Sequence, residues 1–125
     1  QIFVTLQSHK VKALSFISLT AHVSPSAEIG QNALVLPGVF IGHQVKIGNM
    51  FCAHGGSVVE HHSRIGHNVL LGPGVAIASS VHIGSHSFLG TGAKVIPEMR
   101  IGCGSWLGAG SVVIREIPAH VVAFG

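Results

Sequence analysis

The stretch "IGHNVLLGPGVAIASSVHIG" (Ile65–Gly84) carries an aliphatic residue at every sixth position. An α-helix repeats its buried face at about 3.6 residues and a half-buried strand at 2, so neither accounts for this spacing. Followed outward in both directions, the period runs from Ile17 to Val113 without an insertion, and sixteen of its seventeen positions are Ile, Val or Leu. A period of six sustained over such a length is the signature of a hexapeptide β-helix.

A second period of eighteen residues is superimposed on the first. A glycine directly follows the aliphatic residue at Gly30, Gly48, Gly66, Gly84 and Gly102. Three hexads therefore make one coil, and we predict an all-β, parallel β-helix of about five to six coils stacked at about 4.8 Å. The sixth residues are expected to point inward as an aliphatic column. The glycines are expected at a corner whose backbone conformation is closed to residues with a Cβ.

The repeat divides the chain into three parts. Residues 17–118 are predicted to form the β-helix. Residues 1–16 lie outside the period and are expected to be a cap or the remnant of an upstream domain, and residues 119–125 a tail that follows the stop at Pro118. Flat prism faces with few charges favour burial by oligomerisation.

Composition excludes several classes of partner. Charged residues are 9% of the chain, and the net charge of +3 is scattered without a basic cluster, which argues against nucleic acid. No apolar run reaches the length of a membrane span, and no secretion signal is visible, so we expect a cytoplasmic protein. Cys52 and Cys103 are 51 residues apart, nearly three coils, which is too far for a disulfide and fits a reducing compartment.

Histidine is abundant, with ten residues, and two are adjacent in "VVEHHSRIG" (Val58–Gly66). His43 and His61 occupy the same hexad position one coil apart and are expected to face outward. A zinc site needs imidazoles that converge about 2.1 Å from the metal. His62 and His67 have the five-residue spacing of the gamma-class carbonic anhydrases, but their hexad positions differ from that pattern and Ser26 stands two coils before His62. A zinc centre is therefore disfavoured and no metal is expected.

From Thr20 to Gly125 the chain resembles the β-helix domain of the sugar O- and N-acyltransferases typified by sialic acid O-acetyltransferase and the UDP-amino-sugar N-acetyltransferases. The resemblance is carried by "AHVSPSAEIG", "VVEHHSRIG", "LLGPGVAIASSVHIG", "FLGTGAKVIPEMRIG" and "SWLGAGSVVIREIP". It implies left-handed winding, a homotrimer, and transfer of an acetyl group from acetyl-CoA to an amine or hydroxyl of a sugar, expected to be nucleotide-linked.

The resemblance also implies catalytic roles. His61 matches the general base in a groove shared by two subunits. The family usually has an acidic residue directly after this histidine, where this chain has His62, so Glu60 or a carbonyl is the expected orienting group. The backbone N–H of Ser79, one coil later, matches the oxyanion donor, although the family has glycine at that position.

Four further positions are implied to contact ligands. Leu70, Thr91 and Ala109 match CoA-binding positions, with Leu70 replacing a histidine often found there, and His54 matches a position that faces the acceptor substrate. These departures keep open the alternative of a non-catalytic β-helix that serves as an assembly module.

Overall fold

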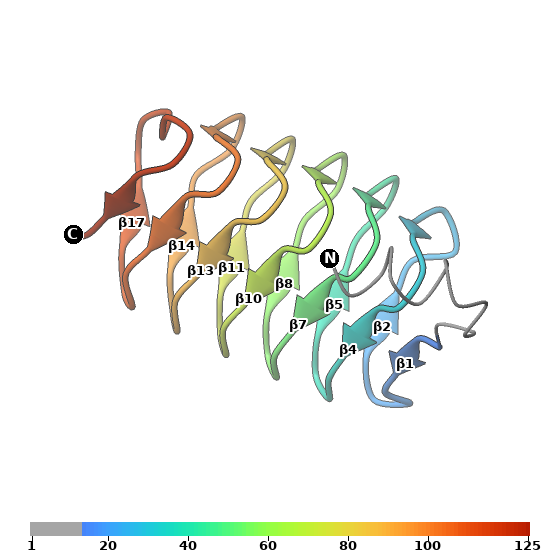
Figure 1. Ribbon diagram of the computed structural model, residues 1–125. Helices are drawn as coiled ribbons and strands as arrows, with labels where there is room; N and C mark the ends of the chain where they lie inside the picture. The colour runs from blue at the N-terminus through green and yellow to red at the C-terminus, as the bar shows by residue number, and fades with distance from the viewer. Residues whose placement is uncertain (1–13) are drawn as a thin grey trace.

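Eighteen two-residue parallel strands wind residues 14–125 into a three-sided prism in the computed structural model, and no helix interrupts them (Figure 1). The structure describes these residues only, so the part of the predicted cap within residues 1–13 lies outside it. The predicted fold class, a left-handed parallel β-helix of hexapeptide repeats, is confirmed. The coils lie side by side from the blue N-terminal end to the red C-terminal end of Figure 1.

The strands form three sheets, one on each side of the prism. The seven-stranded sheet contains β1 (Phe16–Ile17), β4 (Leu34–Val35), β7 (Cys52–Ala53), β10 (Leu70–Leu71), β13 (Phe88–Leu89), β16 (Trp106–Leu107) and β18 (Val122–Ala123). The six-stranded sheet contains β2 (His22–Val23), β5 (Phe40–Ile41), β8 (Val58–Val59), β11 (Ala76–Ile77), β14 (Lys94–Val95) and β17 (Val112–Val113). The five-stranded sheet contains β3 (Glu28–Ile29), β6 (Lys46–Ile47), β9 (Arg64–Ile65), β12 (His82–Ile83) and β15 (Arg100–Ile101).

The second residue of most strands fills the core. Ile41, Val59, Leu71 and Leu89 have no exposed surface, as expected for the aliphatic column. Small residues fill the space beside this column, and five of them among residues 14–125 are buried serines. The Ser111 hydroxyl has no partner there, but the other four are paired, as when Ser57 Oγ donates to the Gly72 carbonyl at 2.9 Å. Such pairing offsets the cost of burying a polar group.

The recurring glycines are needed for a different reason from the one predicted. The left-handed backbone conformation lies two residues further on, as at Asn68 (φ 54°) and Gly104 (φ 65°), and does not occur at Gly66. A Cβ on Gly66 would instead lie 2.6 Å from the Ser85 amide nitrogen of the next coil. The prediction of a special corner conformation at these glycines was therefore wrong: they allow two coils to approach closely.

Residues 119–125, expected as a tail, contribute a further strand. Trp106 in β16 pairs with Val122 in β18, a step of 122 − 106 = 16 residues, whereas other pairs such as Leu70 and Phe88 are 18 apart. The final coil is thus two residues shorter than the others, which is why this strand is invisible to the hexad period.

The Gly66→Ala substitution should lower the free energy of unfolding by about 1–3 kcal/mol, because the added Cβ overpacks the contact between two coils. Gly55→Ala is the matched control: its Cβ would meet only the Pro37 carbonyl oxygen, at 3.2 Å, and the φ of Gly55 is not left-handed. We expect the control to change stability by less than about 1 kcal/mol. Urea unfolding measures both, and equal effects would contradict the close-approach explanation.

Candidate functional site

Two adjacent imidazoles form the centre of the candidate site. His61 and His62 occupy the turn between β8 and β9, at the corner between the six-stranded and five-stranded sheets. Their Nδ1 atoms are 2.9 Å apart and their rings are nearly perpendicular, at 89°. A hydrogen bond at this distance requires one ring to donate its N–H and the other to accept. When His61 donates, its Nε2 is unprotonated and can accept a proton from a substrate.

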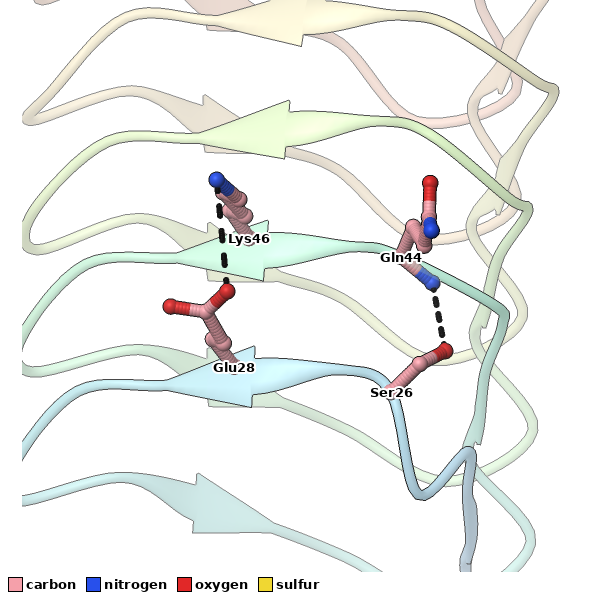
Figure 2. Close-up of polar contacts among 4 residues, drawn as sticks. All are labelled: Ser26, Glu28, Gln44 and Lys46. Carbon is pink, nitrogen blue, oxygen red and sulfur yellow. Dashed lines mark hydrogen bonds and ion pairs between the residues drawn. The ribbon is translucent and has the colours of Figure 1, made fainter.

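This pair is extended by one coil toward the N-terminus. The His43 ring lies edge-on to His62, with ring centroids 5.7 Å apart. His43 Nδ1 is 2.8 Å from Ser26 Oγ. The same oxygen accepts the Gln44 amide N–H at 2.9 Å, as Figure 2 shows. Sequence reasoning did not assign a role to Ser26. The available signal was the eighteen-residue spacing of His43 and His61, which places both at the same corner.

Glu60 and Ser79 differ in how they relate to His61. Within residues 14–125 no hydrogen bond is recorded for the Glu60 carboxylate, so the structure does not join it to the imidazole. Ser79 lies one coil beyond His61, and the neighbouring Ser80 donates its amide N–H to the His61 carbonyl at 3.0 Å. The Ser79 amide has no hydrogen-bond partner among the described residues, which leaves its N–H available to an incoming group.

The other predicted ligand contacts lie at a different corner. His54, Thr91 and Ala109 follow strands of the seven-stranded sheet, in the turns that lead to the six-stranded sheet. Leu70 faces outward from the seven-stranded sheet, half-buried between Cys52 and Phe88. The six-stranded sheet separates this corner from His61. One protomer therefore does not bring the predicted base and the predicted CoA contacts together.

Beside His62 there is a polar cavity that the sequence did not predict. It has a volume of about 320 Å³, and it is lined by Ser26, Glu28, Gln44, Lys46, His62 and Arg64. Lys46 Nζ lies 3.9 Å from Glu28 Oε2, an ion pair between exposed side chains on β6 and β3 (Figure 2). Three of these residues also border an open groove of about 630 Å³ that follows the five-stranded sheet. The cavity thus connects the histidine pair to the groove.

Two titratable groups within residues 14–125 have shifted pKa values. The pKa of His82, on the five-stranded sheet, is lowered first by burial and then by the positive charges of Arg100 and Arg64. Burial raises the pKa of the Cys52 thiol, which lies between Leu34 and Leu70 on the seven-stranded sheet. Cys52 and Cys103 are both free.

Within residues 14–125, no group of three or more His, Cys, Asp or Glu side chains is arranged to hold a metal ion. His62 and His67, considered above for zinc, have other partners: His67 Nδ1 accepts the Asn49 amide N–H at 2.8 Å. In the same part of the chain, no helix has the length and apolar character needed to cross a bilayer.

The chain matches one protein-family model and several solved structures. Residues 62–97 match the family described as bacterial transferase hexapeptide (six repeats). PerB from Caulobacter crescentus, solved in complex with CoA and GDP-perosamine, is 38% identical with a TM-score of 0.98 over 99% of this chain and 60% of PerB. The comparison with curated proteins found no match.

Two further solved structures agree with this match. WeeI from Acinetobacter baumannii AYE is 31% identical, with a TM-score of 0.95 over 99% of this chain and 61% of WeeI. The acetyltransferase domain of PglB from Neisseria gonorrhoeae FA1090, in complex with acetyl coenzyme A, is 28% identical. Its TM-score is 0.98 over 100% of this chain and 61% of the PglB chain. The chain spans about three fifths of the length of these relatives. The repeat, the fold and these matches agree with the resemblance to the hexapeptide-repeat acyltransferases that the sequence predicted.

Proposed function

We propose that the protein transfers an acetyl group from acetyl-CoA to an amine or hydroxyl of a nucleotide-linked sugar. The observation that carries the proposal is the Nδ1-to-Nδ1 hydrogen bond between His61 and His62, because it fixes one imidazole so that its Nε2 can serve as a base. The relatives solved with CoA, acetyl coenzyme A and GDP-perosamine support the co-substrate and the class of acceptor.

In the proposed reaction, His61 Nε2 removes the proton from the acceptor amine or hydroxyl as that group attacks the thioester carbonyl carbon. The new bond turns the carbonyl oxygen into an oxyanion, to which the free Ser79 N–H donates. One such donor stabilises the transition state by about 3 kcal/mol. The intermediate then collapses with cleavage of the carbon–sulfur bond, and the protonated His61 returns its proton to the leaving thiolate of CoA.

His62 acts in this proposal as a positioning residue in place of the acidic side chain expected at that point. An imidazole that accepts the Nδ1 proton of His61 holds the ring orientation as a carboxylate would, and in that arrangement the His61 Nε2 is unprotonated. Glu60 is kept as the alternative orienting group. Leu70, Thr91 and Ala109 are assigned to CoA, and His54 to the acceptor.

A homotrimer completes the proposed site. The base and the CoA contacts lie at the two corners that border the six-stranded sheet, so they meet only when one protomer's His61 corner faces the Thr91 corner of its neighbour. Apolar side chains that are exposed in one protomer, such as Phe16 (57%) and Trp106 (56%), agree with burial between copies. The cytoplasmic location expected from the sequence stays a prediction.

Acetyl-CoA should release free thiol only when an acceptor is present, and His61→Ala should lower kcat by about a hundredfold or more, because a general base is lost. The assay follows thiol release with a panel of nucleotide-linked sugars that offer either an amine or a hydroxyl. His67→Ala, which removes an exposed histidine at another corner, is the control and should keep the rate. If no acceptor raises turnover, or His61→Ala is fully active, the assembly-module alternative is favoured.

His62→Ser should lower kcat while leaving KM for both substrates nearly unchanged, since it removes only the partner of His61. Serine is suited to this corner, because Ser80 occupies the equivalent position with φ 58°. Glu98 occupies the equivalent position two coils after His62, with φ 66°. The His62→Glu variant should therefore fold and recover most of the wild-type rate. A different pH–rate profile in His62→Glu, measured against wild type, would separate positioning from a loss of stability. Equal rates for His62→Ser and wild type would remove His62 from the mechanism.

Mixed assemblies test whether the site is shared between copies. Ala109→Trp should block the CoA corner and His61→Ala the base corner, so each variant alone is inactive. Unfolded and refolded together, the two chains should regain part of the wild-type rate, because some interfaces then combine two intact corners. In the control mixture, the His61→Ala chain is refolded with a chain that carries both substitutions. No interface then contains an intact base corner, so no rate should be regained. No recovery in assemblies shown by light scattering to contain both chains would contradict a shared site.

A further inference from the structure

Positively charged side chains are aligned along the outer face of the five-stranded sheet. The strand register places Lys46 directly beside Arg64, Arg64 beside His82, and His82 beside Arg100. Successive strands are about 4.8 Å apart, so the α-carbons of Arg64 and Arg100 are about 9.6 Å apart. The corresponding outward positions of the seven-stranded sheet are mainly apolar, as Leu34, Leu70 and Phe88 show.

Little negative charge offsets this row. Like charges directly opposite each other on neighbouring strands are unfavourable. The ion pair between Lys46 and Glu28 lies at one end of the row, and both side chains are well exposed, so it is weak. Among residues 14–125, neither Arg64 nor Arg100 has a recorded ion pair or side-chain hydrogen bond. The pKa of His82 is lowered first by burial and then by the charges of Arg100 and Arg64, and the second of these causes agrees with an uncompensated positive field at the centre of the row.

The row lies in a groove rather than on a convex surface. The groove of about 630 Å³ has the size of a small-molecule site. Its lining includes Arg64, His82 and Arg100, and residues 117–119 border it beyond Arg100. Through Arg64 and Lys46 it joins the polar cavity that contains His62. An anion bound in the groove would therefore lie on the same side of the prism as the proposed base.

We propose that Arg64, His82 and Arg100 form a binding site for a diphosphate group. The planar fork of each arginine matches two phosphate oxygens, and two arginines on either side of a central residue suit two linked phosphates better than one. A neutral His82 supplies an N–H donor between them. Two unpaired guanidinium charges are matched by the two or more negative charges of a diphosphate, whereas one carboxylate would leave one arginine unmatched.

Both proposed substrates can carry such a group, since CoA contains a diphosphate and so does a sugar linked to a nucleoside diphosphate. Assigning the site to one of them rests on the proposed function, but the binding of a diphosphate does not. Binding measurements without turnover therefore separate the two ideas: an intact diphosphate site in a protein that acetylates no acceptor would refute only the proposed reaction.

The first experiment titrates inorganic pyrophosphate into the full chain by calorimetry. We expect one pyrophosphate per chain, with an affinity at least about tenfold higher than that for orthophosphate. Arg64→Gln and Arg100→Gln should each weaken pyrophosphate binding at least about tenfold, as expected from the loss of a charge-assisted contact. Lys94→Gln, which removes a similar charge from the six-stranded sheet, should have no more than about a twofold effect. In NMR titrations, bound pyrophosphate should raise the pKa of His82 toward its ordinary range.

The second experiment identifies the source of the diphosphate. If the double variant R64Q/R100Q weakens binding of CoA but not of pantetheine, which lacks the diphosphate, the site holds the co-substrate. If it weakens binding of the nucleotide-linked sugar instead, the site holds the acceptor. The proposal is overturned if pyrophosphate and orthophosphate bind equally, if Lys94→Gln matches the arginine variants, or if the double variant binds both substrates as wild type does.

Discussion

The hydrogen bonds between successive coils are the constraint on which the rest of the molecule depends. Val58 donates its amide N–H to the Val75 carbonyl at 2.8 Å, and Glu60 donates to Ile77 at 2.9 Å, so β8 is held against β11 of the next coil. The same step, repeated along the prism, places each residue over the one eighteen positions earlier. Side chains at a corner or on a face therefore form columns, and a functional group has its nearest partners one coil away. This stacking brings His43 to His62 and Arg64 to His82.

The fold could be read from the sequence because burial restricts the inward positions strongly. Ile65, Leu71 and Ile77 have almost no exposed surface, and an unbroken aliphatic period of six leaves few alternatives. The reason for Gly66 was misjudged, because the sequence shows where a side chain is missing but not which neighbour excludes it. The strand at Val122–Ala123 was missed because its coil is two residues short of the period.

The candidate site could be located but not fully described. The histidine pair was visible, and its position outside the core followed from the hexad phase. In the sequence, His62 stands where the family has an acidic residue, so the group that orients His61 was expected to be lost or replaced. A comparison of residue types cannot show that the His62 imidazole reaches the Nδ1 atom of His61. The row from Lys46 to Arg100 was present at a regular spacing of eighteen residues, but outward strand positions tolerate many residue types and do not stand out against a scattered net charge.

The hydrogen bond between His61 and His62 differs from a histidine–carboxylate pair in one respect. A carboxylate can only accept the ring proton, whereas a second neutral imidazole can either accept it or donate its own. The pair at 2.9 Å therefore has two tautomeric arrangements, one with His61 as the donor and one with His62 as the donor. Only the first arrangement leaves the His61 Nε2 unprotonated. A carboxylate partner would permit that arrangement alone, so the consequence of the second imidazole is a share of molecules in which the base is turned off.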